Sequence, residues 1–534
     1  MSLTSRNIKT DLCVIGGGLS GMSCAIRAAR LGLKVVIIQD RPVFGGNASN
    51  EVRMWICGAQ NQQYKETGLL EEINIENYYL NPNKNFYIWN SILNNKVTSQ
   101  KNLISLLNTT CFEAKTENNL IVSVKAFQMT TQTMFNIKAK YFADCSGDSI
   151  TCAITNAKFM YGREDVQDFG EKMINHFEKD DKTMGNSLLI QARQLDHKVK
   201  FIAPSWAEKI SVEKLKSKGV DLKNPYENFW YVEIGGASDV IKNAENLNKR
   251  LLAICMGVWD TIKNSGEFDA DNFDLEFVGF LPAKRESRRM LGDYILTGND
   301  IRNCKHFDDA VAYGGWPMDD HNPDGFDGEK SNFYIDVPKP YEIPYRCLYS
   351  KNIKNLFFAG RNISLTHMAN SSARVMGTCA VLGEAVGTAS YVAKKYSCSP
   401  RDVLDHIGEL QQLILLNDGF IPNVKREVSN LSLESFLNGS DILRNGEDRD
   451  LGTSKNSVQI ENGKTVKYEI KNKFVKQIKI VFDSDLERNT FMEMHESEKI
   501  HPTRCNQLLD SPTMFVPKTL AKEFSLICKD KDDS

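Results

Sequence analysis

The sequence predicts an α/β fold in which a parallel sheet covered by helices is interrupted by an inserted α+β domain and followed by a small β-rich module. Three segments of the 534-residue chain support the parallel sheet. An apolar strand, a glycine-rich turn, a helix and a second apolar strand follow one another at 11–39. Two further strands that end at a glycine lie far along the chain, at 141–148 and 355–362. Strands alternating with helices in this way typically assemble into one parallel sheet.

The N-terminal unit carries the glycine pattern of a dinucleotide-binding turn. Residues 12–15 form a short apolar run, typical of a strand buried on both faces, and Gly16, Gly18 and Gly21 follow it. Gly16 allows the tight turn, Gly18 lets the backbone approach a pyrophosphate, and Gly21 lets the helix pack on the strand. The free N–H groups and positive dipole end of the helix favour phosphate. We therefore predict a Rossmann-type βαβ unit that binds a nucleotide.

The end of the second strand departs from the usual pattern of such a unit. An acidic residue usually bonds a ribose hydroxyl there, but this sequence has Gln39, followed by Asp40. The amide oxygen of Gln39 can accept the same hydrogen bond, and Asp40 is the alternative acceptor. This position alone does not separate NAD from FAD.

Three later segments point to FAD. The pair Gly45 and Gly46 follows the second strand, YFADCSGD (141–148) follows a hairpin-like stretch, and NLFFAGRN (355–362) precedes a small-residue helix at 376–390. In this order, they resemble the FAD-contacting segments of the glutathione-reductase-like flavoprotein superfamily. In that superfamily the last helix points its N-terminus at the flavin pyrimidine ring, where its dipole stabilises the charge of reduced flavin. The resemblance therefore implies an FAD-binding domain.

Longer stretches resemble one family, the FAD-dependent oxidoreductases common in polysaccharide-degrading bacteria. These stretches are 45–59, 285–301, 308–321, 340–387 and 410–422. The resemblance covers roughly residues 10–425 and implies a flavoenzyme acting on a small molecule, with a sugar-derived substrate suggested by association. The residues expected to contact FAD are Gly16, Gly18, Leu19, Ser20, Gly21, Gln39, Asp40, Arg41, Gly45, Gly46, Asn47, Arg53, Cys111, Phe112, Ser146, Gly147, Gly360, Arg361, Met376, Gly377 and Thr378.

Several functions are disfavoured by what the sequence lacks. Disulfide reductases of the superfamily carry a cysteine pair after the Gly-Gly loop, whereas Cys57 stands alone there, so no dithiol relay is expected. No second GxGxxG follows, so a stably bound nicotinamide is not expected and the electron acceptor or donor stays unidentified. A net charge of −2 gives no reason to expect nucleic acid. The sequence contains no run of 18 apolar residues, so no transmembrane helix is expected. It also contains no cluster of Cys and His residues with the spacing of a zinc site.

The scattered, odd number of cysteines, 13 in all, is typical of reduced thiols in a cytoplasmic protein. The N-terminal residues lack the apolar core of a signal peptide, which agrees with a cytoplasmic setting. A signal peptide removed before this start is the alternative that stays open.

His367 is the first candidate for proton transfer. It lies between the third FAD strand and the flavin-facing helix, where an imidazole could take a hydroxyl proton as hydride leaves the substrate. Arg374, just before that helix, is a candidate ligand for an anionic substrate group or reduced flavin. Arg53, with Glu51, follows the Gly-Gly loop and is expected to face the flavin. A structural role in the loop, or a buried ion pair, is the alternative for each of them.

The region before the third FAD strand adds further candidates. Arg285, Arg288 and Arg289 are expected to form a basic cluster on one helix face, either salt-bridged locally or clamping a substrate carboxylate or phosphate. The segment AYGGWPMDDH, which includes Tyr313, Trp316 and His321, is expected to form a pocket wall or lid. We expect no metal there, because the Asp-Asp-His run does not give a convincing ligand spacing.

The chain is expected to divide into four parts. They are the first part of the FAD-binding domain (1–165), a substrate domain (166–345), the second part of the FAD-binding domain with a closing helix at 402–418 (346–425), and a linker with a β-rich module (426–534). Alternating residues at 457–485 around an ENGK turn predict a hairpin. The aromatic stretch 228–236 is expected to be strand-like, lining a sugar-sized pocket or lying in an ordinary half-buried sheet.

Three functions remain open at this stage. The first is oxidation of an alcohol or a saturated C–C bond, with hydride passing to flavin N5. The second is reduction of a keto or unsaturated substrate, with electrons from a separate donor. The third, from a different class, is a carbohydrate-binding or structural protein that keeps FAD only as a scaffold.

Overall fold

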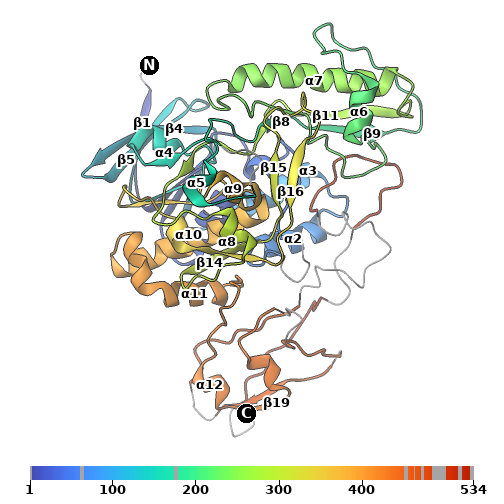
Figure 1. Cartoon of the computed structure of the whole chain (residues 1–534). Helices are drawn as coiled ribbons and strands as arrows, with labels where there is room; N and C mark the ends of the chain where they lie inside the picture. The colour runs from blue at the N-terminus through green and yellow to red at the C-terminus, as the bar shows by residue number, and fades with distance from the viewer. Residues whose placement is uncertain are drawn as a thin grey trace.

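The computed structural model of the chain describes residues 3–59, 65–173, 178–449, 455–461, 463–470, 474–483, 501–514 and 520–529. Within them, a seven-stranded sheet forms the first core, in the order β3-β2-β1-β6-β5-β4, with β18 also paired to β6 (Figure 1). The strands are β1 (Thr4–Ile15), β2 (Val35–Ile38), β3 (Leu103–Leu106), β4 (Thr109–Glu117), β5 (Leu120–Gln128), β6 (Thr133–Asp144) and β18 (Leu356–Phe358).

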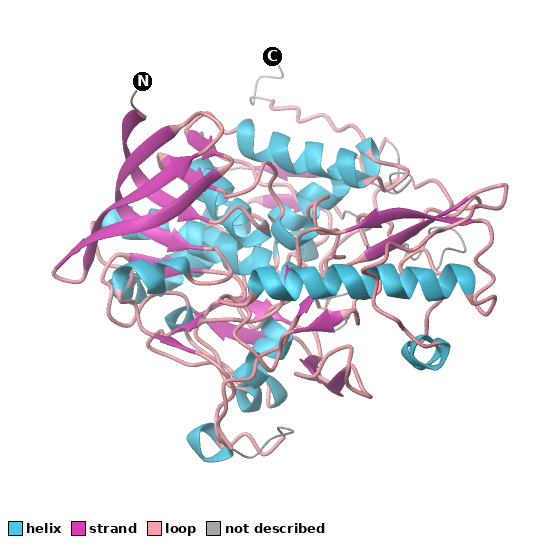
Figure 2. Cartoon of the chain, turned by 90° about the horizontal axis from the view of Figure 1, so that it is seen from above, coloured by secondary structure: helices cyan, strands magenta, loops and turns pink. Residues whose placement is uncertain are grey.

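The parallel strands of this sheet end in register at one edge. Ile15 pairs with Ile38 on one side and with Asp144 on the other, and Phe358 also pairs with Asp144. The turns that leave these strands are therefore side by side, although the first strand ends at Ile15 and the last at Phe358. The predicted parallel sheet is confirmed, and β4, β5 and β6 extend away from this edge as an antiparallel meander beside the N-terminus (Figure 2).

Two helices pack closely against each other over the sheet, α1 (Leu19–Arg30) and α10 (Met376–Tyr396). A Cβ on Gly383 would lie 2.0 Å from the Ser20 carbonyl oxygen, so only glycine permits this distance between the helices. An ion pair between Arg27 and Glu384, both with buried side chains, crosses the same interface. The small residues of α10 therefore set the close approach of the third segment to the βαβ unit.

The inserted part of the chain has a hydrophobic core of its own. This second core is formed by side chains of β9 (Ile190–Gln194), α6 (Val212–Lys218), α7 (Ala244–Asn264) and β11 (Phe273–Val278). Short strands β8 (Asn186–Ser187), β10 (Glu233–Ile234) and β12 (Ala283–Lys284) form a sheet that leads back toward the first core. From β12 the chain runs on to β13 (Arg289–Met290), whose Met290 belongs to the first core.

The remaining elements connect or cover these two cores. They are α2 (Leu69–Leu80), α3 (Phe86–Thr98), α4 (Ile150–Thr155), β7 (Phe159–Met160), α5 (Val166–Phe169), β13 (Arg289–Met290), α8 (Gly298–Arg302), β14 (Ala310–Gly314), β15 (Met318–His321), β16 (Asn332–Ile335), β17 (Tyr341–Pro344), α9 (His367–Ala373), and the short 3-10 helices η1 (Gly46–Ala48) and η3 (Tyr345–Cys347).

The C-terminal part differs in detail from the expectation. The closing helix is confirmed as η4 (Arg401–His406) continuing into α11 (Ile407–Leu416). After it come α12 (Asn430–Leu433), β19 (Phe436–Asn438), η5 (Asp441–Arg444) and β20 (Lys467–Glu469). The predicted hairpin around ENGK is wrong for the described residues, because β20 pairs with β19 and 455–461 are not in a strand. Alternation failed there as a signal because apolar residues such as Ile460, 52% exposed, are not buried against a core.

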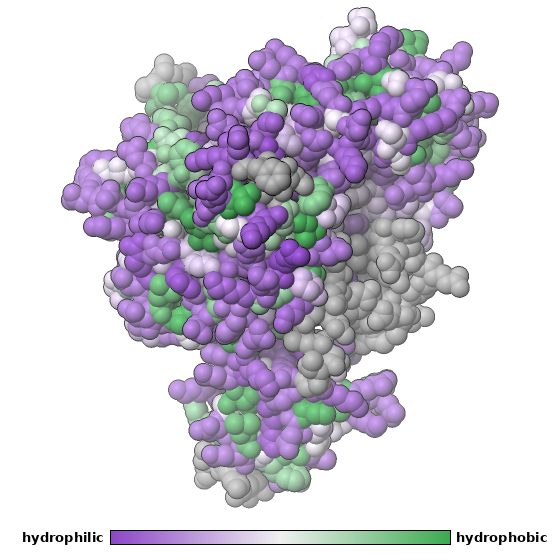
Figure 3. All heavy atoms as spheres, in the orientation of Figure 1, coloured by the Kyte–Doolittle hydropathy of each residue, from purple (hydrophilic) through white to green (hydrophobic). Residues whose placement is uncertain are grey.

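No single described helix has both the length and the apolar composition to cross a membrane; only α9 and α10 taken together do, as a pair bent by 94°. The face shown in Figure 3 is mainly hydrophilic, with hydrophobic residues in scattered patches.

Candidate active site

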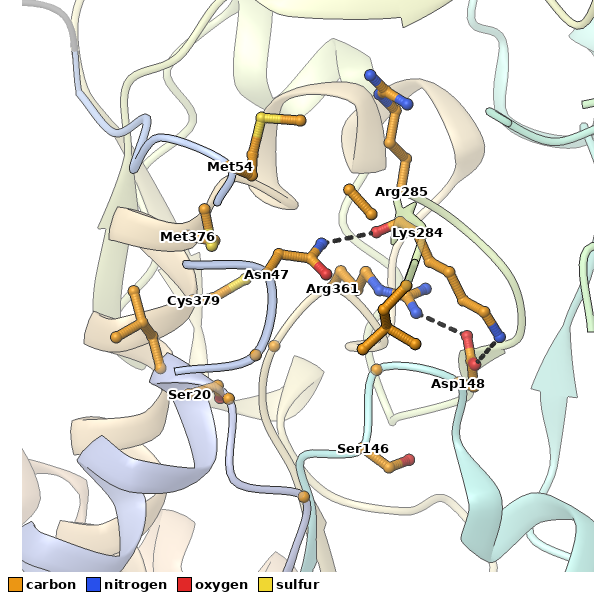
Figure 4. Close-up of a pocket in the computed structure, with 18 of the residues that line it drawn as sticks. Ser20, Asn47, Met54, Ser146, Asp148, Lys284, Arg285, Arg361, Met376 and Cys379 are labelled. Atoms are coloured by element: carbon orange, nitrogen blue, oxygen red, sulfur yellow. Dashed lines mark hydrogen bonds and ion pairs between the residues drawn. The ribbon is translucent and has the colours of Figure 1, made fainter. Parts of the chain in front are cut away.

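A cavity of about 910 Å³ lies at the edge where the parallel strands end (Figure 4). Its walls come from the turns after β1, β2, β6 and β18, from the first residues of α1 and α10, and from the inserted domain. A site at the carboxyl ends of parallel strands, facing helix N-termini, is the usual ligand position in an open α/β sheet. Its volume lies within the range of sites for small molecules and cofactors.

Three glycines shape the turn between β1 and α1. Gly16 has a φ of 103°, and a Cβ there would lie 2.4 Å from the Cys145 carbonyl oxygen. A Cβ on Gly21 would lie 1.8 Å from the Gly16 carbonyl oxygen, so this glycine sets the packing of α1. A Cβ on Gly18 has its nearest protein neighbour at 3.8 Å and would extend into the cavity. Gly16 and Gly21 are therefore required by the fold. Gly18 instead leaves space between the glycine-rich turn at 16–21 and the Gly45–Gly46 loop beside it, and we call these two loops the cradle.

Gln39 has a role that the sequence did not indicate. Its side-chain oxygen accepts a hydrogen bond from Gly17 N–H at 2.8 Å, and its nitrogen donates to the Val43 carbonyl at 3.0 Å. Both polar atoms of the amide are thus used to join the two loops of the cradle. The neighbouring Asp40 also lines the cavity and has an exposed carboxylate, so its oxygens, unlike the amide oxygen of Gln39, face the solvent-accessible cavity.

A charged cluster ties the inserted domain to the cradle. Asp148 forms ion pairs with Lys284 at 2.7 Å and Arg361 at 2.6 Å, and Asn47 donates to the Lys284 carbonyl at 3.1 Å (Figure 4). Burial of Asp148 disfavours its charge, but the attraction of Arg361 and Lys284 keeps its pKa well below the ordinary value. Asp148 and Lys284 were not among the residues predicted from the sequence. Asp148 directly follows the predicted Ser146 and Gly147, and only the fold brings Lys284 beside it.

The other half of the cavity contains a second charged cluster centred on His321. Its Nδ1 lies 2.6 Å from Glu233 Oε2, and its Nε2 lies 3.2 Å from Asp319 Oδ2. Arg285 Nη1 lies 3.2 Å from the same Glu233 oxygen, and Arg374 Nη2 lies 3.5 Å from Asp319 Oδ2. Four of the five residues are less than 9% exposed, and the side chain of the fifth, Arg374, is 11% exposed. The cavity lining includes Arg285, Asp319, His321 and Arg374.

The charges in this cluster support one another. Burial raises the cost of a charge on Glu233, but Arg285 and His321 lower its pKa below the ordinary value. The pKa of Asp319 is likewise held well below its ordinary range, against its own burial, by His321 and Arg374. Both carboxyl groups are therefore ionised at neutral pH and hold His321 by both ring nitrogens.

The expectation of a helix through Arg285, Arg288 and Arg289 is wrong. This stretch runs from β12 to β13, so the three side chains diverge. Arg285 reaches the cavity, Arg288 Nε donates to the Asp148 carbonyl at 3.0 Å, and Arg289 is fully buried beside Glu164. Lys284 and Arg285 also point to opposite sides (Figure 4). A short extended segment between two cores, rather than an exposed helix face, explains this arrangement.

His367 does not line the cavity, in contrast to its predicted position. It is 2% exposed, with Nδ1 2.8 Å from Glu286 Oε2 and Nε2 3.0 Å from Asp320 Oδ1. Burial alone would lower its pKa, but the two carboxylates raise it to about 10. The imidazole of His367 is therefore a buried cation between two carboxylates, and it is excluded from proton transfer to a substrate because it does not reach the cavity.

Arg53 also lies away from the cavity. Its guanidinium stands 4.1 Å from the centre of the Phe277 ring, and Nη1 donates to Gln191 at 2.8 Å. Its φ of 64° is in the left-handed region, which turns the chain and directs this side chain between the two cores. Glu51, by contrast, lines the cavity, and its burial raises its pKa above the ordinary value.

Of the segment AYGGWPMDDH, Trp316 and His321 line the cavity. Tyr313 is buried elsewhere, and its hydroxyl donates to the Lys65 carbonyl at 2.8 Å. The stretch 228–236 was expected to be strand-like, but only Glu233–Ile234 in it form a strand. Trp230, in a turn of that stretch, also lines the cavity, with its ring edge-to-face with His321 at 5.4 Å. In the described part of the chain, no group of three His, Cys, Asp or Glu side chains is arranged to hold a metal ion.

Most of the residues expected to contact FAD line this one cavity. They are Gly16, Gly18, Leu19, Ser20, Gln39, Asp40, Arg41, Gly45, Gly46, Asn47, Cys111, Ser146, Gly147, Gly360, Arg361 and Met376. The residues that do not line it are Gly21, Arg53, Phe112, Gly377 and Thr378. The Phe112 side chain is 44% exposed, because alternate residues of β4 point to opposite faces and Cys111 takes the inner one.

The cradle end of the cavity has the features of a dinucleotide site. The N-termini of α1 and α10 face it without a side-chain cap, so free N–H groups and two positive dipole ends are available. Buried polar atoms without a partner also occur there, the Oγ of Ser20 and the Nη1 of Arg41. A bound diphosphate and ribose would satisfy such donors, so the residues present fit the group.

Comparison with known proteins agrees with this geometry. The model of a family described as FAD dependent oxidoreductase matches residues 11–414. Glycerol-3-phosphate dehydrogenase of Mycobacterium leprae is 39% identical over 62 residues, which are 12% of this chain and 11% of that protein. Mitochondrial dihydrolipoyl dehydrogenase of Schizosaccharomyces pombe is 50% identical over 46 residues, 9% of each chain. These matches therefore span only about a tenth of each relative.

Among solved structures, a geranylgeranyl bacteriochlorophyll reductase-like protein of Thermoplasma acidophilum is similar over 77% of this chain and 86% of its own. The sequence identity is 11% and the TM-score 0.34.

Proposed function

This chain belongs to the FAD dependent oxidoreductase family, and on that basis we propose that it transfers a hydride between a small, carbohydrate-derived substrate and FAD. It is an FAD-dependent enzyme. Bound FAD supplies a hydride acceptor or donor at N5. The observation that carries the proposal is the single cavity that joins the glycine cradle to the His321 cluster. We further propose that the fold is that of the glutathione-reductase-like superfamily, since the order of the three segments supports it.

The residues proposed to hold FAD are those of the cradle. The backbone around Gly18 and the N-terminus of α1 would bind the diphosphate, and Asp40 would bind the ribose. The N-terminus of α10 would stabilise negative charge on the flavin ring. Arg361 and Lys284, partly neutralised by Asp148, add positive charge on the same side.

His321 is the proposed proton-transfer residue in place of His367. It belongs to the cavity wall, and the carboxylate of Glu233 orients its ring and stabilises the imidazolium. The bond from Nε2 to Asp319 is the longer of its two, so Nε2 is the nitrogen that a substrate hydroxyl can reach by displacing Asp319. The step requires a neutral His321 whose proton is on Nδ1, toward Glu233. In the oxidative direction Nε2 of this neutral ring accepts the hydroxyl proton, and in the reductive direction the imidazolium returns that proton to the product.

The lining of this half of the cavity supports a sugar-like substrate. Trp55, Trp230 and Trp316 provide three aromatic faces, and three of the six tryptophans in the chain are thus gathered at one cavity. Two residues of the lining, Asn186 and Arg374, have buried polar atoms without a hydrogen-bond partner. These atoms are Nδ2 and Oδ1 of Asn186 and Nε of Arg374. A polyol presents apolar C–H faces and several hydroxyls, which match aromatic rings and unpaired donors and acceptors.

Reduction of a keto or unsaturated substrate by a separate electron donor is the second candidate. The same cluster would serve it, with His321 as the proton donor to the product. The scaffold interpretation has less support, because the described C-terminal residues show one two-stranded ladder, β19 with β20, and no larger sheet. The 13 free cysteines support the proposed reducing, cytoplasmic setting.

An anaerobic absorbance titration of the FAD-bound protein tests this function. Sugars, polyols, uronic acids and small carboxylates would be added in turn, and bleaching of the flavin band near ~450 nm would identify a substrate and the oxidative direction. Reoxidation of the dithionite-reduced protein by keto or unsaturated compounds would support the second candidate. A yellow protein that responds to neither set would contradict both.

A further inference from the structure

Residues 501–514 lie outside the stretch that matches the family, yet the structure buries the first of them deeply. Cys505 and Asn506 are fully buried, and Thr503 and Arg504 are 2% and 3% exposed. Nothing in the sequence analysis singled out this segment. In Figure 1 it is the brown-red trace beside α6 and α3, far from β19 and the other C-terminal elements. Burial of this degree means that the segment is packed into the body of the molecule.

One side of the segment binds the inserted domain. Gln507 N–H donates to the Ala192 carbonyl at 2.9 Å, and Gln194 N–H donates to the Gln507 carbonyl at 2.8 Å, so the segment runs parallel to β9. The Asn506 side chain accepts from Ala192 N–H at 2.9 Å and donates to the Leu222 carbonyl at 3.2 Å. In the described residues β11 is the strand paired with one edge of β9, and these bonds place the segment along its other edge.

The other side binds the loop between α2 and α3. Asn77 Nδ2 donates to the Pro502 carbonyl at 2.7 Å, and the buried Lys84 Nζ donates to the His501 carbonyl at 2.6 Å. Met514 N–H donates to the Pro82 carbonyl at 2.7 Å. The segment is therefore bonded at once to the second core and to helices of the first core.

His501 brings this segment to the wall of the cavity. Its ring stacks on Trp55 with centroids 5.2 Å apart and planes at 12°, and it also packs against Tyr226 at 5.2 Å. Trp55 lines the cavity, and Met54 and Cys57 beside it do so too. A stacked ring on the outer face of Trp55 restricts the rotation of the indole, and so fixes the shape of the cavity at that wall.

We propose that residues 501–514 form a strap that completes the active site, with His501 as the residue that positions Trp55. That Trp55 faces the substrate rests on the proposed function; its contact with His501 does not. The strap holds the inserted domain against the FAD-binding domain, and His501 keeps the indole in place from behind.

Alkylation of Cys57 tests the strap without a substrate. The thiol lies two residues from Trp55 and is half-buried at the cavity, so its reaction with N-ethylmaleimide reports on that wall. The full-length FAD-bound protein would be treated and the modified peptides followed by mass spectrometry. The variants are His501→Ala, which removes the stacked ring, His501→Phe, which keeps a ring, and Leu509→Ala, a change at a 64% exposed position of the same strap.

In H501A, Cys57 is expected to react roughly tenfold faster, because the wall opens more often. H501F and L509A are expected to react at close to the wild-type rate. Fully buried Cys255, in the second core, serves as the internal control, since a general loss of stability would accelerate both thiols. Unchanged reactivity in H501A, or equal acceleration in H501F, would overturn the proposal. If H501A does not fold, H501Q takes its place.

The flavin content separates this result from the proposed function. A protein that cannot be reconstituted with FAD would contradict the function, while the alkylation rates of the apoprotein would still decide whether His501 holds Trp55.

Discussion

Asp319 and Asp320 are neighbours in β15, yet each bonds a different histidine. Asp319 Oδ2 lies 3.2 Å from His321 Nε2, and Asp320 Oδ1 lies 3.0 Å from His367 Nε2. Successive side chains of a strand point to opposite faces, so one histidine stands at the cavity and the other behind it. A glutamate bonds the second nitrogen of each ring. The two histidines therefore have similar partners but different access to a substrate, which allows their roles to be separated by mutation.

Replacement of His321 by Gln is expected to slow flavin reduction by the substrate by about 10²- to 10⁴-fold, the usual contribution of a general base. FAD binding should be retained, because His321 lies outside the cradle. Stopped-flow absorbance under anaerobic conditions measures the rate, and the visible spectrum measures FAD content. His197→Gln is the matched control, since this histidine is exposed, lies outside the cavity lining and has its Nδ1 beside the exposed Asp196. A rate within threefold of wild type in H321Q would remove His321 from the mechanism.

Replacement of His367 by Gln is expected to act on stability instead. It leaves the buried carboxylates of Glu286 and Asp320 without their shared cation, which typically costs about 3–5 kcal/mol. Urea denaturation followed by far-UV circular dichroism would measure the loss. H367Q protein that folds as stably as wild type, and yet fails to reduce its flavin, would return the proton-transfer role to His367.

The stability conferred by His367 should depend on pH in one direction. Its pKa is raised from 6.5 to about 10 in the folded protein by Glu286 and Asp320, against the effect of burial. Below pH 6.5 both folded and unfolded states hold the proton, and the contribution is complete. Between pH 6.5 and 10 the unfolded state releases the proton first, so the contribution falls as pH rises. The difference in unfolding free energy between wild type and H367Q should therefore shrink over this interval; a constant difference would contradict the assignment.

The cradle was largely predictable from the sequence because its geometry is local. Gly16, Gly18 and Gly21 act within one turn, and the strand and helix beside them carry unmistakable apolar periodicity. The ends of β6 and β18 were also predictable, since each apolar strand ends at a glycine. Phe112 was wrongly expected to contact FAD. In a strand, alternate residues face inward, and the sequence of the exposed edge strand β4 does not show whether Cys111 or Phe112 does so.

The substrate half could not be predicted with the same accuracy, because it is assembled from distant segments. Glu233 and His321 lie in strands of two and four residues, and Arg285 directly follows the two-residue strand β12. Elements this short give no periodic signal in the sequence. His367 was chosen for its position beside the flavin-facing helix, but α9 directs it inward to Glu286. The strap at 501–514 gave no signal at all, since its burial depends on hydrogen bonds to β9 and the α2–α3 loop.

Arg374 is expected to contribute to substrate binding through its Nε. That atom is buried and has no partner in the described structure, whereas Nη2 is occupied by Asp319. Arg374→Lys keeps the positive charge but loses the planar guanidinium, so KM should rise about tenfold or more, equivalent to about 1.4 kcal/mol. FAD content should not change. Arg288→Lys is the control, because Arg288 does not line the cavity. Equal KM values in the two variants would show that Arg374 serves the loop and not the substrate.

Gly18 and Gly21 should respond in opposite ways to substitution by alanine. Gly18 has a φ of −67°, and its added Cβ would meet no protein atom within 3.8 Å, so G18A should fold normally. Its methyl group would occupy the cradle, and the Kd for FAD should rise about 10- to 100-fold, or roughly 1.4–2.8 kcal/mol. In G21A the Cβ would stand 1.8 Å from the Gly16 carbonyl oxygen, so α1 must move and the apoprotein should lose about 1–3 kcal/mol.

Fluorescence titration of apoprotein with FAD and thermal unfolding of the same samples separate these two effects. Gly408→Ala is the control for both measurements, because its Cβ would meet nothing within 4 Å and its backbone is helical. Because a Cβ at Gly18 would extend into the cavity and not into the protein, a G18A protein that binds FAD as tightly as wild type would mean that the diphosphate does not lie in the cradle, whatever the thermal stability of G21A.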